Sequence, residues 1–482
     1  MTHSTSLTVL QLNDSHAYCD LHQELFWQGR QAVYHPAGGY ARIAALVKQV
    51  RAANQKRVLF CDCGDTLQGT YPAQTTQGQA MVPVLNSLGL DAMTAHWEFA
   101  YGPATFAQRA AELSYPVLAI NVYHQATKER LFPPYSVKEI GALRIGLVGI
   151  ASNIVGMTMP PSFSEGLEFT LGREELPPII DVLRTQEKVD LIVLISHLGF
   201  SQDSKLLSEV EGIDVCLSGH THNRLYKPAL QGKTLIIQSG CHGSFLGRLD
   251  LEINRGRVVD YRHQLIEVEA NIHPDPAVDD LVCHALAPYN EELSTVVGAT
   301  ATALNRGTTL ETTMDNFLLQ ALLEQTGVQL AFSNGWRFGA PIIRGPVTLN
   351  DLYNIIPMNP PISTVELTGE EVVTMLEENL ERTFARDPYD QMGGYVKRAL
   401  GLNAYIKIDN PPGQRIQQVF VGDEPLQLGR SYAAAFVTEQ GVAPKYGHQR
   451  ETHSERAIDA MRAYLEKHRP LQAELRGTFV AV

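Results

Sequence analysis

Short apolar runs alternate with polar turns and amphipathic stretches from residue 7 to about residue 270. Eight of the runs have the length and composition of buried strands: LTVLQLN, RVLFCDCGD, LDAMTAH, PVLAINV, RIGLVGIAS, DLIVLISHLG, DVCLSGHTH and TLIIQSG. Helical patterns such as GGYARIAALVKQVRAA lie between them. This alternation predicts an α/β layered domain with well-buried sheets. GRLDLEI and VVDYRHQLIEVEA follow without a helix, so the domain is expected to close with an antiparallel pair.

The rest of the chain divides into a connector and a second domain. Two prolines introduce a long helical stretch over residues 271–296, which we interpret as a linker helix. Residues 297–482 have the pattern of a second α/β domain, with helices predicted over 312–327 and 367–383. A Thr-Gly-Glu cap signal opens the later helix. The predicted organisation is therefore a domain over 1–270, a linker helix over 271–296 and a domain over 297–482.

Composition narrows the classes of partner. The 482 residues include 44% hydrophobic and 19% charged residues, which is typical of globular proteins. The net charge is −13 and basic residues form no run, which argues against nucleic acid or an anionic membrane as a partner. A small anionic substrate remains compatible, because a metal centre dominates the charge around it. Apolar runs of transmembrane length are absent from the sequence.

The N-terminus and the cysteines bear on the compartment. The first residues, MTHSTSLTVLQLND, lack the basic and apolar segments of a secretory signal. We therefore expect a cytoplasmic protein, or a periplasmic one if a leader has been removed. The six cysteines show no disulfide framework, and we interpret them mainly as small apolar core residues.

Residues with metal-binding side chains follow five of the predicted strands. Ligands of open α/β sheets bind at the carboxyl ends of the strands. The chain has 16 histidines, so a single histidine at the end of a strand could occur there by chance. Seven residues with metal-binding side chains at the ends of five strands are not explained by chance. The set is Asp14, His16, Asp65, His96, His197, His220 and His222.

These residue types suit a pair of divalent ions. Two ions about 4 Å apart need a shared carboxylate together with imidazole and carboxylate ligands. Asp65 is the predicted bridge. Asp14, His16 and His222 would complete one ion, and His96, His197 and His220 the other. Mixed nitrogen and oxygen donors favour Mn, Zn, Fe or Co over Ca or Mg. Such ions would activate a hydroxide toward a tetrahedral phosphorus or sulfur centre.

The order D-x-H, G-D, S-H-L-G and G-H-T-H resembles the calcineurin-like metallophosphoesterases. The second half resembles the C-terminal domain of the 5′-nucleotidase family, in LETTMDNFLLQAL and in the segment that begins FSNGWRFGAPIIRG. The resemblance implies a four-layer catalytic domain with manganese as the expected metal, followed by an α/β domain that recognises substrate. It implies catalytic roles for Asp65, His96 and Arg337. The substrate-binding residues that it implies are Arg306, Asn334, Trp336, Arg337 and Tyr395.

Two departures from the family pattern concern the substrate. The pattern G-N-H-E-F-D-Y-G becomes AHWEFAYG, so Trp97 and Ala100 replace the His and Asp that would stabilise a leaving group. The motif G-G-D-G-Y-x-x-F, which places an aromatic residue against a nucleobase, is absent from the sequence. H-W-E-F and QMGGYVKRALGL also resemble the SoxB-type thiosulfohydrolases, which use manganese to remove a sulfonate from a carrier-protein cysteine S-thiosulfonate.

Three functions follow from these patterns. The leading one is a metal-dependent hydrolase that acts on a nucleotide-like phosphoester or a related tetrahedral anion. The second is a SoxB-like thiosulfohydrolase, whose thiolate leaving group has a pKa of about 8.5 and needs no proton to depart. The third is a sensor that binds metal and anion without catalysis.

Overall fold

The computed structural model describes residues 4–54 and 57–482. The chain forms two compact units. The first contains residues up to His22 and Pro36–Pro288, and the second contains Gln23–His35 and Tyr289–Val482. Most of the hairpin of β2 (His22–Gln28) and β3 (Gln31–Ala37) therefore groups with the C-terminal part of the chain.

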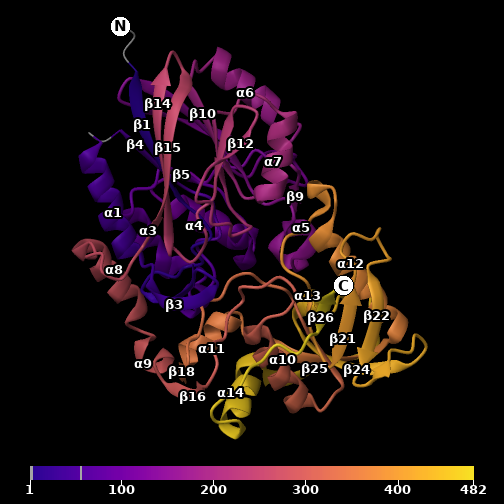
Figure 1. Ribbon diagram of the computed structural model, residues 1–482. Coiled ribbons are helices and arrows are strands. Elements are labelled where there is room, and N and C mark those ends of the chain that lie inside the picture. The colour runs from indigo at the N-terminus through magenta and orange to yellow at the C-terminus, as the bar shows by residue number, and fades with distance from the viewer. Residues whose placement is uncertain (1–3, 55–56) are drawn as a thin grey trace. The chain divides into compact units, whose positions relative to one another are not determined.

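The first unit is built on two sheets (Figure 1). In one, β1, β4 and β5 are parallel, and the antiparallel hairpin β14–β15 confirms the predicted closing pair. In strand order, this sheet consists of β15 (Arg257–Glu267), β14 (Phe245–Asn254), β1 (Thr5–Leu12), β4 (Val58–Asp62) and β5 (Ala92–Met93). The other consists of β12 (Ala229–Gln231), β13 (Thr234–Ile237), β11 (Val215–Ser218), β10 (Leu191–Ser196), β8 (Leu143–Ile150) and β7 (Tyr135–Ile140).

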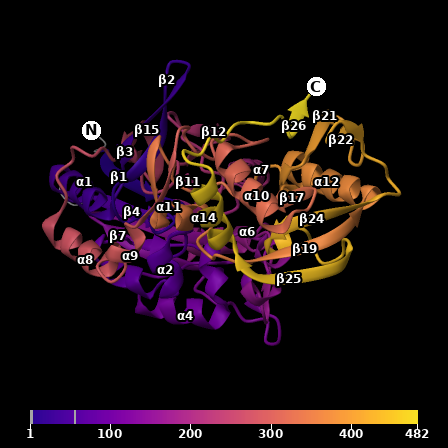
Figure 2. The same ribbon diagram turned by 90° about the horizontal axis from the view of Figure 1, so that it is seen from below.

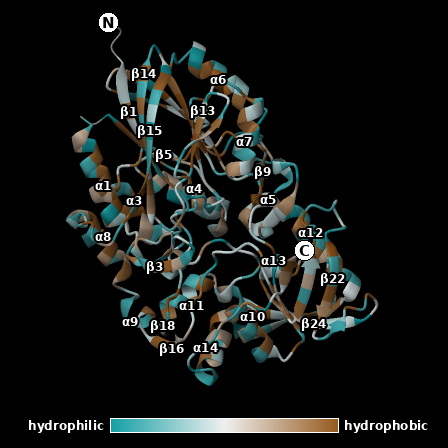
Figure 3. Cartoon of the chain, viewed as in Figure 1, coloured by the Kyte–Doolittle hydropathy of each residue, from teal (hydrophilic) through white to brown (hydrophobic). Residues whose placement is uncertain are grey.

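One hydrophobic core joins the two sheets. Val9 and Leu59 of the first sheet and Val193 and Val215 of the second belong to the same buried cluster. The amphipathic helix α6 (Leu176–Thr185) shows both apolar and polar residues in Figure 3, as expected for a helix with one solvated face. The helices of this unit are α1 (Tyr40–Ala53), α2 (Tyr71–Thr75), α3 (Val82–Ser87), α4 (Pro103–Glu112), α5 (Val155–Thr158), α6 (Leu176–Thr185), α7 (Phe200–Glu209) and α8 (Pro276–Leu286). A small ladder pairs β6 (Val122–His124) with β9 (Leu167–Phe169).

The second unit has two further sheets. Figure 2 shows β17, β24, β19 and β25 side by side, in the order of their pairing. The larger sheet consists of β20 (Arg398–Leu400), β17 (Leu330–Ser333), β24 (Ser431–Val437), β19 (Pro361–Thr368) and β25 (His448–Arg456). The smaller consists of β23 (Glu424–Pro425), β22 (Ile416–Val421), β21 (Leu402–Ile406) and β26 (Phe479–Ala481), and β16 (Val296–Thr300) pairs with β18 (Gly345–Thr348). The helices are α9 (Asn290–Leu293), α10 (Thr313–Thr326), α11 (Leu349–Ile355), α12 (Gly369–Phe384), α13 (Thr438–Gly441) and α14 (Ala457–Lys467).

The predicted helices can be compared with these bounds. Helices α10 and α12 confirm the predictions over 312–327 and 367–383, and Thr368 forms a capping box with Glu371. The prediction of one long linker helix was wrong, because α8 and α9 are separate. Pro288 lies in the interruption, where its ring and its missing N–H oppose a continuous helix. Within the described ranges no helix is long and apolar enough to cross a membrane.

Candidate metal centre

The seven predicted metal-binding residues lie just beyond the carboxyl ends of parallel strands. Asp14 and His16 follow β1, Asp65 follows β4 and His96 follows β5 in one sheet. His197 follows β10, and His220 and His222 follow β11, in the other sheet. Five of the seven have a left-handed backbone, which is rare outside glycine and concentrates at functional sites: Asp14, His16, Asp65, His220 and His222.

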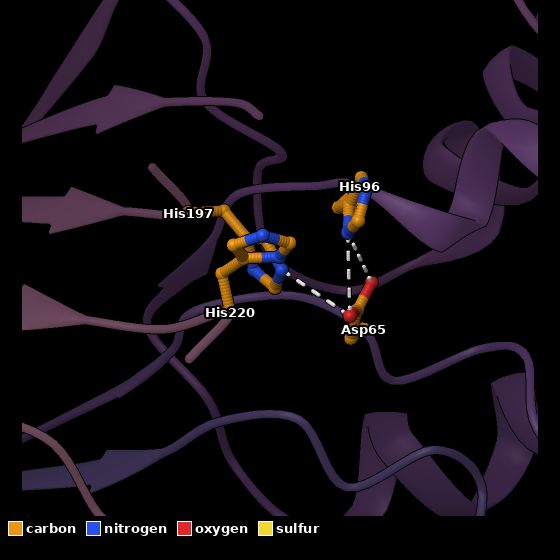
Figure 4. A group of neighbouring side chains, drawn as sticks. All are labelled: Asp65, His96, His197 and His220. Carbon is orange, nitrogen blue, oxygen red and sulfur yellow. Dashed lines mark hydrogen bonds and ion pairs between the residues drawn. The ribbon is translucent and has the colours of Figure 1, made fainter. Parts of the chain in front are cut away.

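The side chains form two groups that share Asp65. Their donor atoms lie within 4.8 Å of one another in each group. The first group is Asp65, His96, His197 and His220, drawn in Figure 4, and the second is Asp14, His16, Asp65 and His222. This is the division that the sequence predicts. Both groups have a donor set able to hold a metal ion.

Distances within the groups fit ligands of a common ion. The distance from Asp65 Oδ1 to His96 Nδ1 is 3.2 Å, and that from Asp65 Oδ2 to His197 Nε2 is also 3.2 Å. In the second group, Nε2 of His16 and Nε2 of His222 are 3.3 Å apart. Two ligands about 2.1 Å from one ion are separated by roughly 3 to 3.5 Å. Nδ1 of His197 contacts the Cys63 carbonyl, which leaves the buried Nε2 facing the Asp65 carboxylate. That arrangement is typical of a histidine held for a metal.

The electrostatics of the site keep Asp65 ionised. Burial acts to raise the pKa of Asp65, but the nearby His197 and His96 hold it well below its usual range. For His197, burial acts to lower the pKa, and Asp65 and Asp14 outweigh it and raise the pKa to about 10. The carboxylates of Asp65 and Asp14 thus favour a positive charge next to His197. A metal ion bound there would displace the proton from the His197 imidazole.

Glu98 supports the centre in a way that sequence reasoning did not identify. Its carboxylate is fully buried and accepts main-chain N–H groups of Thr66 (2.6 Å), Leu67 (3.3 Å) and His96 (2.8 Å). Glu98 therefore holds the turn after β4 against the turn after β5, and with it the positions of two candidate ligands. Its place two residues after His96 was visible in the sequence, but its partners Thr66 and Leu67 are main-chain groups of another segment.

Replacing Glu98 with Gln is expected to weaken metal affinity about 10- to 100-fold, because supporting residues of metal ligands have effects of that size. The amide would offer one acceptor oxygen where two are in use. Metal titration followed by calorimetry measures the change. Glu129→Gln, at an exposed position of the same unit, is the matched control. Equal affinities in the two variants would refute the supporting role.

Trp97 also contacts the centre. Its main-chain N–H donates to Asp65 Oδ1 at 2.8 Å, and its indole, 9% exposed, lies edge-on to Phe163.

His242 is a second residue that sequence reasoning missed, although it follows strand β13 closely. Its ring centroid lies 6.3 Å from that of His16, and its main-chain N–H donates to the Asp14 carbonyl.

The predicted substrate-binding residues gather around one loop of the second unit. The Arg337 guanidinium lies 5.7 Å from the Tyr395 ring centroid, and Asn334 contacts Gln440. Arg306 lies 5.6 Å from the Trp336 ring centroid, but its side chain is only 1% exposed and binds Asp315. Arg306 therefore supports the loop, and its direct contact with substrate stays a prediction.

Comparisons with known proteins show a likeness to the 5′-nucleotidases. Residues 294–438 match the family model described as the 5′-nucleotidase C-terminal domain. The chain is 26% identical over 457 residues to a snake venom 5′-nucleotidase of Naja atra, a match that covers 86% of this chain and 84% of that one. These likenesses support a hydrolase that contains a 5′-nucleotidase C-terminal domain. The hydrolase is also 24% identical to the trifunctional nucleotide phosphoesterase YfkN of Bacillus subtilis, and spans 30% of the length of that protein.

Two solved structures of Thermus thermophilus confirm the fold of this chain. The sulfate thiohydrolase SoxB in complex with glycerol superposes with a TM-score of 0.92 at 26% identity, covering 99% of this chain and 96% of that one. A 5′-nucleotidase precursor superposes with a TM-score of 0.87 at 23% identity, covering 99% of each. The predicted mixed α/β architecture and the predicted family are thus confirmed. The structural likeness extends both to a protein named for phosphoester chemistry and to one named for sulfur chemistry.

Proposed function

We propose that this protein is a dinuclear metal-dependent hydrolase of the 5′-nucleotidase superfamily, which acts on a nucleotide-like phosphoester or a related tetrahedral anion. The observation that carries the proposal is the pair of four-residue groups that share Asp65. Two divalent ions held there would activate water and neutralise the oxygens of the tetrahedral centre. Manganese is the proposed metal, and the mixed donor set also suits Zn, Fe or Co.

The protein's own residues would hold the two ions, orient their ligands and bind the substrate. Asp65 would be the ligand common to both ions, and Glu98 keeps the turns after β4 and β5 in place. His197 is oriented through Nδ1, so that Nε2 remains for the metal. The second unit would bind the substrate through Arg337, Asn334 and Tyr395.

Hydrolysis of sulfur compounds is a second candidate function, favoured by one observation. Trp97 occupies the place of a leaving-group histidine and is fixed there by its main-chain bond to Asp65. A thiolate leaves without the proton that an alkoxide requires. A cysteine S-thiosulfonate would then be the substrate, and its hydrolysis would release sulfate and leave a persulfide anion on the cysteine.

A hydrolysis panel tests the proposal and separates the alternatives. The panel contains AMP, a UDP-sugar, an aryl phosphate and a cysteine S-thiosulfonate peptide, each with protein of known metal content. Turnover of a phosphoester supports the leading function, and turnover of the peptide alone supports the sulfur alternative. Protein that holds both metals and hydrolyses none of the four would contradict both hydrolase proposals and favour a metal-binding sensor.

Arg337→Ala tests the role proposed for the second unit. Loss of a charged contact to an anionic substrate is expected to raise KM about 10- to 100-fold, since hydrogen bonds to charged groups are worth about 1.5 to 3 kcal/mol. Metal content and melting temperature should stay near their wild-type values. Steady-state kinetics and metal analysis measure these quantities. A variant that loses metal together with activity would contradict the separation of roles.

A further inference from the structure

One buried side chain of the first unit holds the loop that follows β11. Gln238 is the first residue after β13 and is 0% exposed. Its Nε2 donates to the Ser218 hydroxyl at 3.1 Å and to the Gly219 carbonyl at 2.5 Å. Its Oε1 accepts the Thr221 hydroxyl at 3.0 Å and the main-chain N–H of Asn223 at 2.5 Å. The contacts of Gln238 therefore alternate along the loop with the two histidines of the G-H-T-H sequence.

The partners of Gln238 fix the orientation of its amide. A carbonyl can only accept a hydrogen bond, so the amide nitrogen must face Gly219. A main-chain N–H can only donate, so the amide oxygen must face Asn223. A carboxylate of the same size would place an oxygen against the Gly219 carbonyl, and buried polar groups that lose a partner cost free energy. The position therefore requires a side chain that both donates and accepts at its end.

The loop that Gln238 holds contributes to both candidate metal groups. His220 belongs to the first group and His222 to the second. Their φ angles are 71° and 56°, a left-handed backbone that persists in residues with a side chain only where the surroundings hold it. The main-chain N–H of His220 also lies 3.0 Å from both carboxylate oxygens of Asp14, a member of the second group. A displacement of this loop would therefore disturb ligands of both ions at once.

We propose that Gln238 is a positioning residue that sets the affinity for both metal ions together, because it fixes His220 and His222 relative to one another. The inference rests on the proposed function in that both groups are taken to hold metal. Glu98 holds turns of the first sheet, whereas Gln238 holds the loop after β11 in the second sheet. The centre thus has a buried supporting side chain for ligands from each sheet.

Gln238→Glu tests the inference, because it keeps the size of the side chain and removes the donor at its end. Metal-free protein is titrated with Mn²⁺ alone and followed by calorimetry. Both equivalents should bind about 10- to 100-fold more weakly than in the wild type, the size of effect that supporting residues of metal ligands have. His222→Ala should instead weaken one equivalent more than the other. Gln264→Glu, at an exposed position on β15, is the matched control and should bind like the wild type.

Variants of Thr221 keep the test decisive if Gln238→Glu fails to fold. The Thr221 hydroxyl donates to Gln238 and accepts the main-chain N–H of Phe200 at 3.1 Å. Thr221→Val removes this hydroxyl at nearly constant size and should weaken both equivalents about 2- to 10-fold. Thr221→Ser keeps the hydroxyl and should bind like the wild type. Thr234→Val is the matched control, because Thr234 is a buried threonine at the opposite end of β13, where its hydroxyl donates to a main-chain carbonyl.

The melting temperature of each metal-free variant separates a positioning role from a purely structural one. Weaker binding of both equivalents, with Thr221→Ser close to the wild type, would support the inference. A lower melting temperature with unchanged Mn²⁺ affinity would overturn it, and so would a loss confined to one equivalent. Wild-type protein that binds two equivalents but hydrolyses no substrate would count against the proposed function alone. Variants that bind Mn²⁺ like their controls, while the wild type is an active two-metal hydrolase, would count against the inference alone.

Discussion

Asp65→Ala is expected to remove both metal ions and to lower the hydrolysis rate at least about 10³-fold. Asp65 belongs to both ligand groups, and its carboxylate oxygens lie 3.2 Å from histidine nitrogens of the first. Without it, each ion loses one of four protein ligands and the charge between them. The expected rate loss follows from the several kcal/mol that metal ions contribute to stabilising a transition state. Metal analysis of purified protein measures the first effect and steady-state kinetics the second.

Variants that remove a ligand from only one of the two groups test whether Asp65 is the ligand that both groups share. His222→Ala removes a ligand of the second group only, and His220→Ala a ligand of the first only. Each should lower the metal content by one ion more readily than by two. His263→Ala, on strand β15 and outside both groups, is the control for removal of a histidine. Wild-type occupancy of both ions in Asp65→Ala would show that Asp65 is not the shared ligand.

The second large effect is a steep dependence of rate on the leaving group. Trp97 and Ala100 leave no acid at the place where the family pattern has a His and an Asp. An aryl phosphate should therefore be hydrolysed at least about 10²-fold faster than AMP, because a positioned general acid contributes about 10²- to 10⁴-fold. Values of kcat/KM for the two substrates, corrected for differences in binding, measure the gap.

A double variant tests the cause of that dependence. Trp97→His combined with Ala100→Asp should narrow the gap between the aryl phosphate and AMP. Trp97 also packs against Phe163, so the melting temperature of the double variant must be measured beside its kinetics. Trp97→Phe is the matched control, because it changes the packing without adding an acid. Efficient AMP hydrolysis by wild-type protein would contradict the proposal that this site is adapted to leaving groups that need no proton.

The candidate metal residues could be predicted because strand order dictates their meeting. Asp14, Asp65 and His96 each follow one of three adjacent parallel strands, so the sheet itself brings them to one edge. His197 and His220 reach the centre from the second sheet by the same rule. The ligand type of each residue was therefore enough to propose the two groups that the structure contains. Binding of metal by these groups stays a prediction.

Features that depend on loops were not predictable from the pattern. Glu98 acts through the N–H groups of Thr66 and Leu67, and main-chain partners leave no trace in the sequence. Arg306 was expected to contact the substrate, but Asp315 engages it inside the second unit. Such pairs form where several loops meet, so hydrophobic periodicity does not reveal them. The break at Pro288 is different, because the proline in the sequence already opposed a continuous helix.

The most direct measurement of the central claim is a metal titration of metal-free protein, with bound metal and hydrolysis rate followed together. Two groups that share Asp65 predict two equivalents of Mn²⁺ per chain at saturation. Hydrolysis of the aryl phosphate should rise mainly as the second equivalent binds. Full activity at one equivalent, or activity in metal-free protein, would contradict a dinuclear hydrolase.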